Sequence, residues 1–465
     1  SENERLTLEL GYRFANGYSI DVLYGDNSTD QGILRDRDNT TTINGLLTFG
    51  VGGLAFEDES FEIRLTSPQD ARFRWLLGYN RIEQSVTGGV GGGIGLTVLN
   101  NQIVGLSLPS VTEQTDSDFD GIFAALSYDI TEQLTVDIEA RRQTDKVTNA
   151  VGTPGERSEE FKDTAPRYIL TWQPNDGTTV YTSWARGLLP GTTNANLNNF
   201  NAADIAALQA AYPGAAEVVD SEELESFEIG IKQDFGRWRY ALTYYDMDWS
   251  NRKNQVFTPC VSGGPGVCLN PSGDPDDPRP SGTGQINAVV PQEAEVRGLE
   301  GDITVQVLDS LVMGATLSWV DAENGRFQSI FTANATGEAD ADGKTPIEYP
   351  EESASLYGQL ELPAWGGNSW YARADVLYTG KSYVDDSNQS YIDAFTTVNL
   401  RGGLSGANWR VEGYVNNLTD EDGWMAGRRS TDFSTFFFAG LTQSAVAIPI
   451  RRQTMGLRVS YDLSL

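Results

Sequence analysis

The feature that most constrains the fold of this chain is an alternation of apolar and polar residues with a period of two. In residues 134–141, Leu, Val, Ile and Ala occupy the even positions, and Thr, Asp, Glu and Arg occupy the odd ones. Segments 72–80, 408–416 and 454–463 repeat the pattern. Because successive side chains of a β-strand point to opposite faces, each segment predicts a strand with one apolar and one polar face.

Strands of this kind fit either a soluble β-sandwich or a barrel whose apolar face contacts lipid. The strand units run past ten residues, as in 224–235, which is followed at once by 237–249. Strands of soluble sheets are rarely this long, and so large a soluble sheet would have to split and bury its apolar faces. We therefore predict an all-β fold in which residues 1–465 form a transmembrane antiparallel β-barrel.

The composition agrees with a barrel that has a polar interior. The apolar share of the 465 residues is 39%, below the usual value of about 45–50%. Histidine is absent, which excludes Ser-His-Asp catalysis and His-ligated zinc. The formal net charge of −32 argues against nucleic acid as a partner. We expect no enzymatic activity, no cofactor and no metal centre.

Short and long connections between the predicted strands alternate along the chain. The short ones lie near 15–17, 67–71, 131–133, 174–177, 235–236, 308–310, 363–368 and 403–407. The long ones cover 26–57, 85–116, 146–159, 189–221, 252–284, 324–347, 382–390 and 419–450. Short turns at one rim and long loops at the other are the layout of bacterial outer-membrane barrels. Within one long loop, residues 202–212 predict a short helix that packs over the mouth.

The strand count is about 17, although bacterial single-chain barrels have even numbers. With the short turns in the periplasm, the first and the last strand would both run inward. Two explanations are open: residues 41–50 form a further strand, or the sequence lacks the beginning of the protein.

Several phrases, in order along the chain, resemble the C-terminal part of TonB-dependent outer-membrane receptors of the siderophore-receptor type. They are FEIRLTSP (61–68) with FRWLLGY (73–79), YTSWARGLLP (181–190) with Asn194, ESFEIGIK (225–232), VRGLEG (296–301) and NNLTDE (416–421). The resemblance implies a 22-stranded barrel with a plugged lumen. We find no plug domain and no energy-coupling box, so we expect an N-terminally truncated barrel that lacks about five strands.

The resemblance also implies a function. It predicts an active-transport receptor in the outer membrane of a Gram-negative bacterium, which takes up a scarce bulky ligand, a ferric siderophore. The expected partners are the lipid bilayer, the ligand as a metal chelate, and the TonB complex through the plug region. Two alternatives remain: a passive porin-like channel, and a structural barrel component completed or covered by other outer-membrane chains.

Aromatic and arginine side chains in the long loops are candidates for ligand contacts, since these residues dominate binding hot spots. The candidates are Trp249, Trp424, Arg428, Arg429 and Phe436, for which ordinary loop packing is the alternative. Charged residues on the polar face of the strands would line the lumen: Glu62, Arg64, Arg74, Glu139, Arg141, Lys232, Arg373, Asp375, Arg410, Glu412 and Arg458.

Other motifs in the loops carry weaker signals. Cys260 and Cys268 are too far apart in sequence for a CxxC pair and predict a local disulfide, with two unpaired thiols as the alternative. DSDFDG (116–121) opens like a calcium loop, but Ser127 stands where that loop needs Glu. The acidic tip 338–343 could bind divalent cations weakly. GGVGGGIG (88–95) lies outside any βαβ unit, so it does not predict a nucleotide site.

Overall fold

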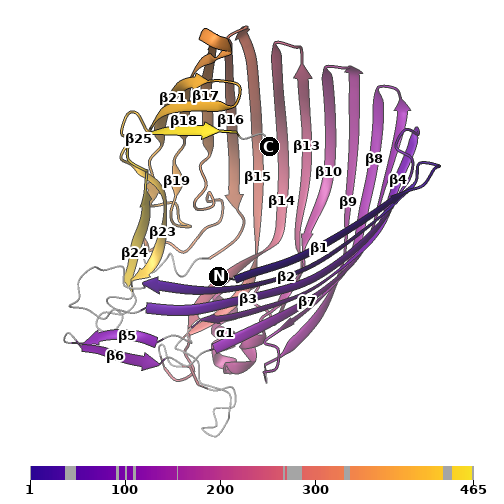
Figure 1. Cartoon of the computed structure of the whole chain (residues 1–465). Helices are drawn as coiled ribbons and strands as arrows, with labels where there is room; N and C mark the ends of the chain where they lie inside the picture. Colours follow the sequence, from indigo (N-terminus) through magenta and orange to yellow (C-terminus); the bar gives the residue numbers. More distant parts are fainter. Residues whose placement is uncertain are drawn as a thin grey trace.

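A computed structural model describes residues 2–36, 49–90, 94–99, 102–107, 111–153, 155–264, 268–269, 285–328, 336–432 and 442–462. In these residues 17 strands form one antiparallel sheet, and eight short strands form four separate two-stranded sheets. The large sheet curves into a wall that follows the chain from β1 to β25 (Figure 1). No helix in this part of the chain is long and apolar enough to cross a membrane.

Each strand of the wall pairs with the next wall strand along the chain. The wall consists of β1 (Glu2–Arg13), β2 (Ser19–Asp36), β3 (Phe49–Thr66), β4 (Phe73–Val90), β7 (Val111–Thr131), β8 (Leu134–Asn149), β9 (Arg157–Asn175), β10 (Thr178–Leu189), β13 (Glu222–Asp234), β14 (Trp238–Pro259), β15 (Gln285–Leu308), β16 (Leu311–Asn324), β17 (Glu352–Pro363), β18 (Ser369–Thr379), β21 (Phe395–Ser405), β22 (Trp409–Asn416) and β25 (Thr454–Tyr461).

The remaining elements lie in the long loops and one short turn. The hairpins are β5 (Ile94–Leu99) with β6 (Gln102–Ser107), β11 (Thr192–Thr193) with β12 (Val218–Val219), β19 (Ser382–Tyr383) with β20 (Tyr391–Ile392), and β23 (Trp424–Asp432) with β24 (Thr442–Pro449). The helices are η1 (Ala195–Asn199), α1 (Ala202–Ala211) and η2 (Trp365–Gly367), so the predicted helix at 202–212 is confirmed.

The period-two pattern gives the wall an apolar outer face. Leu126, Ile138 and Tyr168 stand directly opposite one another on β7, β8 and β9, and between 44% and 48% of each side chain is exposed. Exposed aromatic residues near the short turns add the girdle that interfaces favour: Tyr12, Tyr128, Trp172, Trp238, Trp370 and Tyr461. Exposed apolar side chains in such numbers require a lipid environment, as the alternation predicts.

Close packing on the polar face explains part of the high glycine content, which is 49 of the 465 residues. The Tyr181 ring covers Gly230, where an added Cβ would lie 2.5 Å from the ring. The Tyr245 ring covers Gly298 in the same way, at 2.3 Å. Any larger residue at either position would displace the tyrosine.

The long loops are shorter than the sequence predicts, because the hairpins continue past the apolar alternation. Residues 26–57 are predicted as loop, yet β2 and β3 pair as far as Asp36 and Phe49. Beyond the membrane both faces of a hairpin meet water, so backbone pairing can continue without an apolar face. Of the possible extra strand at 41–50, residues 49–50 belong to β3 and 41–48 lie outside the described residues.

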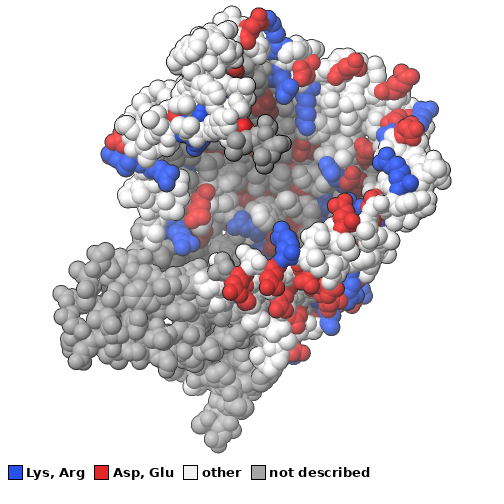
Figure 2. Space-filling model, in the orientation of Figure 1, with Lys and Arg blue, Asp and Glu red and all other residues white. Residues whose placement is uncertain are grey.

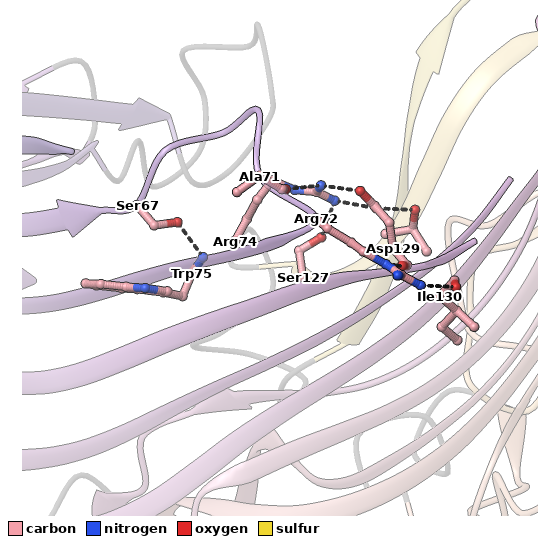
Figure 3. Close-up of polar contacts among 9 residues, drawn as sticks. Ser67, Ala71, Arg72, Arg74, Trp75, Ser127, Asp129 and Ile130 are labelled. Carbon is pink, nitrogen blue, oxygen red and sulfur yellow. Dashed lines mark hydrogen bonds and ion pairs between the residues drawn. The ribbon is translucent and has the colours of Figure 1, made fainter. Parts of the chain in front are cut away.

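At the short-turn rim, Arg74 on β4 clamps the end of β7 (Figure 3). Its two terminal nitrogens donate to the two carboxylate oxygens of Asp129 at 2.6 and 2.8 Å. The same guanidinium donates to the Ser127 hydroxyl at 2.8 Å and to the Ala71 carbonyl at 3.0 Å. Because a planar guanidinium matches a carboxylate in two parallel hydrogen bonds, this contact holds the two hairpins in one register.

We expect Arg74→Gln and Asp129→Asn to lower the melting temperature by similar amounts, and the double variant to lower it little further. Each single change removes the same bidentate contact, so the effects should not add. Thermal unfolding of the four proteins in one detergent measures the coupling. Additive losses would show that the two side chains act independently.

Candidate ligand-binding site

A compact hydrophobic unit, here called the cap, lies at the long-loop end of the wall. It is built from the β10–β13, β14–β15 and β16–β17 loops together with the ends of β14 and β15 next to their connecting loop, and α1 marks its position in Figure 1. Leu208 of α1 and Ile286 of β15 are completely buried, and the rings of Tyr212 and Phe327 lie 6.2 Å apart. The cap therefore draws loops that are distant in sequence into one folded body.

Two buried polar side chains hold the cap together. In the first turn of α1, Asp204 accepts hydrogen bonds from the backbone N–H groups of Val261 and Ser262, at 2.6 and 2.8 Å. Asn194 pairs with Val289 as another strand residue would, because its Oδ1 accepts from the Val289 N–H and its Nδ2 donates to the Val289 carbonyl. Buried polar groups satisfied in this way rigidify a fold.

Cys260 and Cys268 form a disulfide within the cap, with their Cα atoms 5.0 Å apart. Both residues are buried and belong to the apolar core of the cap. The bond closes the loop that Asp204 contacts, so the two features restrain the same segment.

Trp249, one of the predicted ligand contacts, lies on the polar face of β14, next to the cap on the side of the short-turn rim. Its indole N–H donates to the Glu222 carboxylate at 3.0 Å, and the Arg252 guanidinium lies 5.5 Å from its ring centre. Glu222 also accepts from the Lys253 backbone N–H at 3.0 Å. Trp249 is therefore half-buried in a polar cluster, with its N–H engaged by the protein itself.

The predicted contacts that lie on β23 belong to a different part of the mouth. Trp424 and Arg428 are exposed on β23 of the β23–β24 hairpin. The Arg429 backbone pairs with Ala445 in that hairpin, and nothing is described of its side chain. Phe436 lies outside the described residues. The four candidates that the structure describes thus divide between the main wall and a loop hairpin.

A hollow of about 610 Å³ on the polar face of the wall was not predicted as a site. Four arginines and two carboxylates line it, from strands β18, β21, β22 and β25 and the segment before β25: Arg373, Arg401, Arg451, Arg458, Asp375 and Glu412. Four of these six belong to the charged lumen set that the alternation predicts. The cross-strand register adds Arg401 by pairing it with Arg373, and Arg451 comes from the segment before β25, which has no strand pattern.

Tyrosine rings hold the arginines of this region in place. The Arg373 guanidinium lies 4.1 Å from the Tyr357 ring centre, and Arg410 lies 4.5 Å from that of Tyr371. The Tyr371 hydroxyl in turn donates to Glu412 at 2.7 Å. Stacking on an aromatic face leaves the guanidinium edge available for hydrogen bonds.

A second hollow, of about 410 Å³, has the opposite character. Glu300 and Asp302 line it together with Lys232 and several hydroxyl-bearing residues of β10 and β14 to β17. The wall therefore changes from acidic near β15 to basic near β25, and Figure 2 shows charged side chains of both signs within the hollow of the curved wall.

The loop motifs have other structural roles. Residues 116–121 lie entirely within β7, where alternate side chains point to opposite faces and cannot converge on one ion. In the acidic tip, Asp340 and Asp342 lie in a loop in which the Asp340 carboxylate accepts from the Asp342 N–H at 3.1 Å. GGVGGGIG starts within β4 and ends within β5 rather than opening a helix, and its residues 91–93 lie outside the described part.

The amino-acid sequence from residue 1 to residue 418 matches the family model described as TonB dependent receptor-like, beta-barrel. The chain belongs to this family. The match places the wall in the outer membrane of a Gram-negative bacterium, with the apolar face toward lipid.

Solved receptors share the fold at low sequence identity. The ferric yersiniabactin uptake receptor FyuA from Yersinia pestis is 14% identical with a TM-score of 0.70, over 99% of this chain and 61% of that one. The ferripyoverdine receptor of Pseudomonas aeruginosa is 14% identical with a TM-score of 0.68, over 99% and 56%. The ferric citrate transporter FecA is 13% identical with a TM-score of 0.65, over 99% and 61%. The chain therefore spans about three-fifths of the length of these receptors.

Proposed function

We propose that this chain forms the wall and mouth of an outer-membrane active transporter for a bulky metal chelate, a ferric siderophore. The observation that carries the proposal is the combination of a polar, arginine-bearing lumen face with a folded cap over its outer end. Family membership and the similarity to receptors for ferric siderophores and ferric citrate support it.

The cap also favours a gated transporter over a passive pore. A porin-like channel needs an open aqueous path, whereas here several long loops fold together into an apolar core at the mouth. A cap stabilised by a disulfide and buried hydrogen bonds is suited to hold a ligand and exclude other solutes.

We propose further that additional strands, about five, join β1 to β25, and that a plug region couples the barrel to TonB. The support lies in the two edges: among the described strands, β1 pairs only with β2, and β25 pairs only with β22. Unpaired backbone groups at a sheet edge are not tolerated in the hydrocarbon region of a membrane.

Iron uptake by cells tests this function. A strain deleted for the complete gene should lose uptake of one radiolabelled ferric chelate out of a catecholate, a hydroxamate and a carboxylate type, and the gene should restore it only when TonB is present. Uptake of none of the three, or uptake without TonB, would contradict the proposal. Steady ion conductance of the purified protein in a planar bilayer would instead support the porin.

A further inference from the structure

A row of arginines descends the lumen face of the wall on strands β18 to β25. Arg373 and Arg401 stand opposite each other, and Arg401 is level with Tyr414 of β22. Arg458 is level with Glu412, two residues nearer the short-turn rim, and Arg410 lies two residues nearer still. Because two residues of a strand span about 7 Å, the arginines form steps about 7 Å apart. We call Arg373, Arg401, Arg458 and Arg410 the arginine ladder.

The ladder lies in a region of positive charge within a strongly acidic protein. The 610 Å³ hollow is lined by Arg373, Arg401 and Arg458 of the ladder. In total it contains four arginines and two carboxylates, a net charge of +2, whereas the whole chain carries −32. The pairing with the local carboxylates is loose at two steps, since Arg401 lies 3.8 Å from Asp375 and Arg458 lies 3.7 Å from Glu412. In the part of the chain that the structure describes, these side chains are 43% and 71% exposed on the lumen face of the wall.

From this geometry we propose that the arginine ladder is the path and the charge filter for the transported chelate, which carries a net negative charge. The inference rests on the proposed function and names the class of cargo: an anionic ferric complex with carboxylate or catecholate oxygens at its surface. Arginine suits such oxygens because its planar fork donates two parallel hydrogen bonds.

Spacing and volume favour a small anion over a protein segment. The hollow falls within the range of about 300–1,000 Å³ that is typical of small-molecule sites. Movement through a protein requires several sites that bind weakly enough to release, and evenly spaced, partly neutralised arginines meet that requirement. The smaller, acidic hollow, which Glu300 and Asp302 line, would repel the same anionic cargo and confine it to the arginine ladder.

The test compares Arg401→Gln, Arg458→Gln and the double variant with the wild type, all as the complete protein in the outer membrane. The control is Lys232→Gln, which also removes one positive charge from the lumen face but lies in the acidic hollow. For the chelate that the wild type transports, three quantities are measured: its net charge, its binding to cells at 4 °C, and its uptake at 37 °C, together with the melting temperature of each protein.

We expect the transported chelate to be anionic and the double variant to take it up roughly tenfold more slowly, because two charge-assisted contacts along the path are lost. Surface binding, melting temperature and the Lys232→Gln control should stay at the wild-type level. An uncharged or cationic cargo, or unchanged uptake by the double variant, would contradict the proposed role of the arginine ladder but not the proposed transport function. A lower melting temperature with slower uptake would show instead that the arginines dock a protein segment. If the wild type itself takes up no ferric chelate, the proposed function fails along with the ladder.

Discussion

Leu126→Arg is expected to destabilise the folded barrel by about 2–4 kcal/mol, the cost of a charged residue on the lipid face near the membrane midplane. Leu126 points outward from β7 and lies beside Ile138 of β8. The neighbouring Ala125→Arg is expected to have little effect, because residue 125 faces the lumen opposite Glu139 and the new charge meets water and a carboxylate. Two adjacent positions of one strand thus form a matched pair.

Guanidinium-induced unfolding in lipid vesicles, followed by tryptophan fluorescence, measures both effects. Both variants place an arginine at neighbouring positions of β7, and the comparison therefore reports chiefly on the face that receives the charge. Equal destabilisation by the two variants would contradict the assignment of the faces.

Asp204→Ala is expected to loosen the cap by about 2–4 kcal/mol without unfolding the wall, because it leaves two buried backbone N–H groups without their acceptor. Those groups belong to Val261 and Ser262, next to Cys260. Asp220→Ala serves as the control, since Asp220 is an exposed acidic residue of the same long loop.

Hydrogen exchange of backbone amides reports the loosening locally. Faster exchange is expected in 202–212 and 256–262, with unchanged exchange in β8 and β9. Unchanged exchange in α1 would show that the apolar core of the cap is sufficient without Asp204. Faster exchange throughout the wall would show that cap and barrel unfold as one unit.

The wall could be predicted from the sequence because its cause is local. Each lipid-facing residue, such as Ile138, follows the period-two rule within its own strand, so strand number, faces and short turns need no knowledge of neighbours. Strand ends could not be predicted, since pairing such as Asp36 with Phe49 depends on the partner strand and not on an apolar face.

The candidate site was less predictable because it depends on register and on contacts between distant loops. The sequence identifies Arg373 as a lumen residue, but only the pairing of β18 with β21 puts Arg401 beside it. Tyr212 and Phe327 meet in the cap across more than a hundred residues, which no local pattern indicates. Trp249 was selected for its residue type alone, and the structure shows its N–H bound to Glu222.

The central claim is that the wall spans the membrane, with one face toward lipid and the other toward a polar lumen. A nitroxide scan of residues 136–141 on β8 in native outer membranes tests this claim most directly. Nitroxide reagents react with free thiols, and Cys260 and Cys268 are bonded to each other. The label should therefore attach to the cysteine introduced at each scanned position. Labels at 136, 138 and 140 should be accessible to lipid-soluble oxygen, and labels at 137, 139 and 141 to a water-soluble nickel chelate. Equal accessibility of odd and even positions to both reagents would contradict the assignment of the even positions to lipid and of the odd positions to a polar lumen.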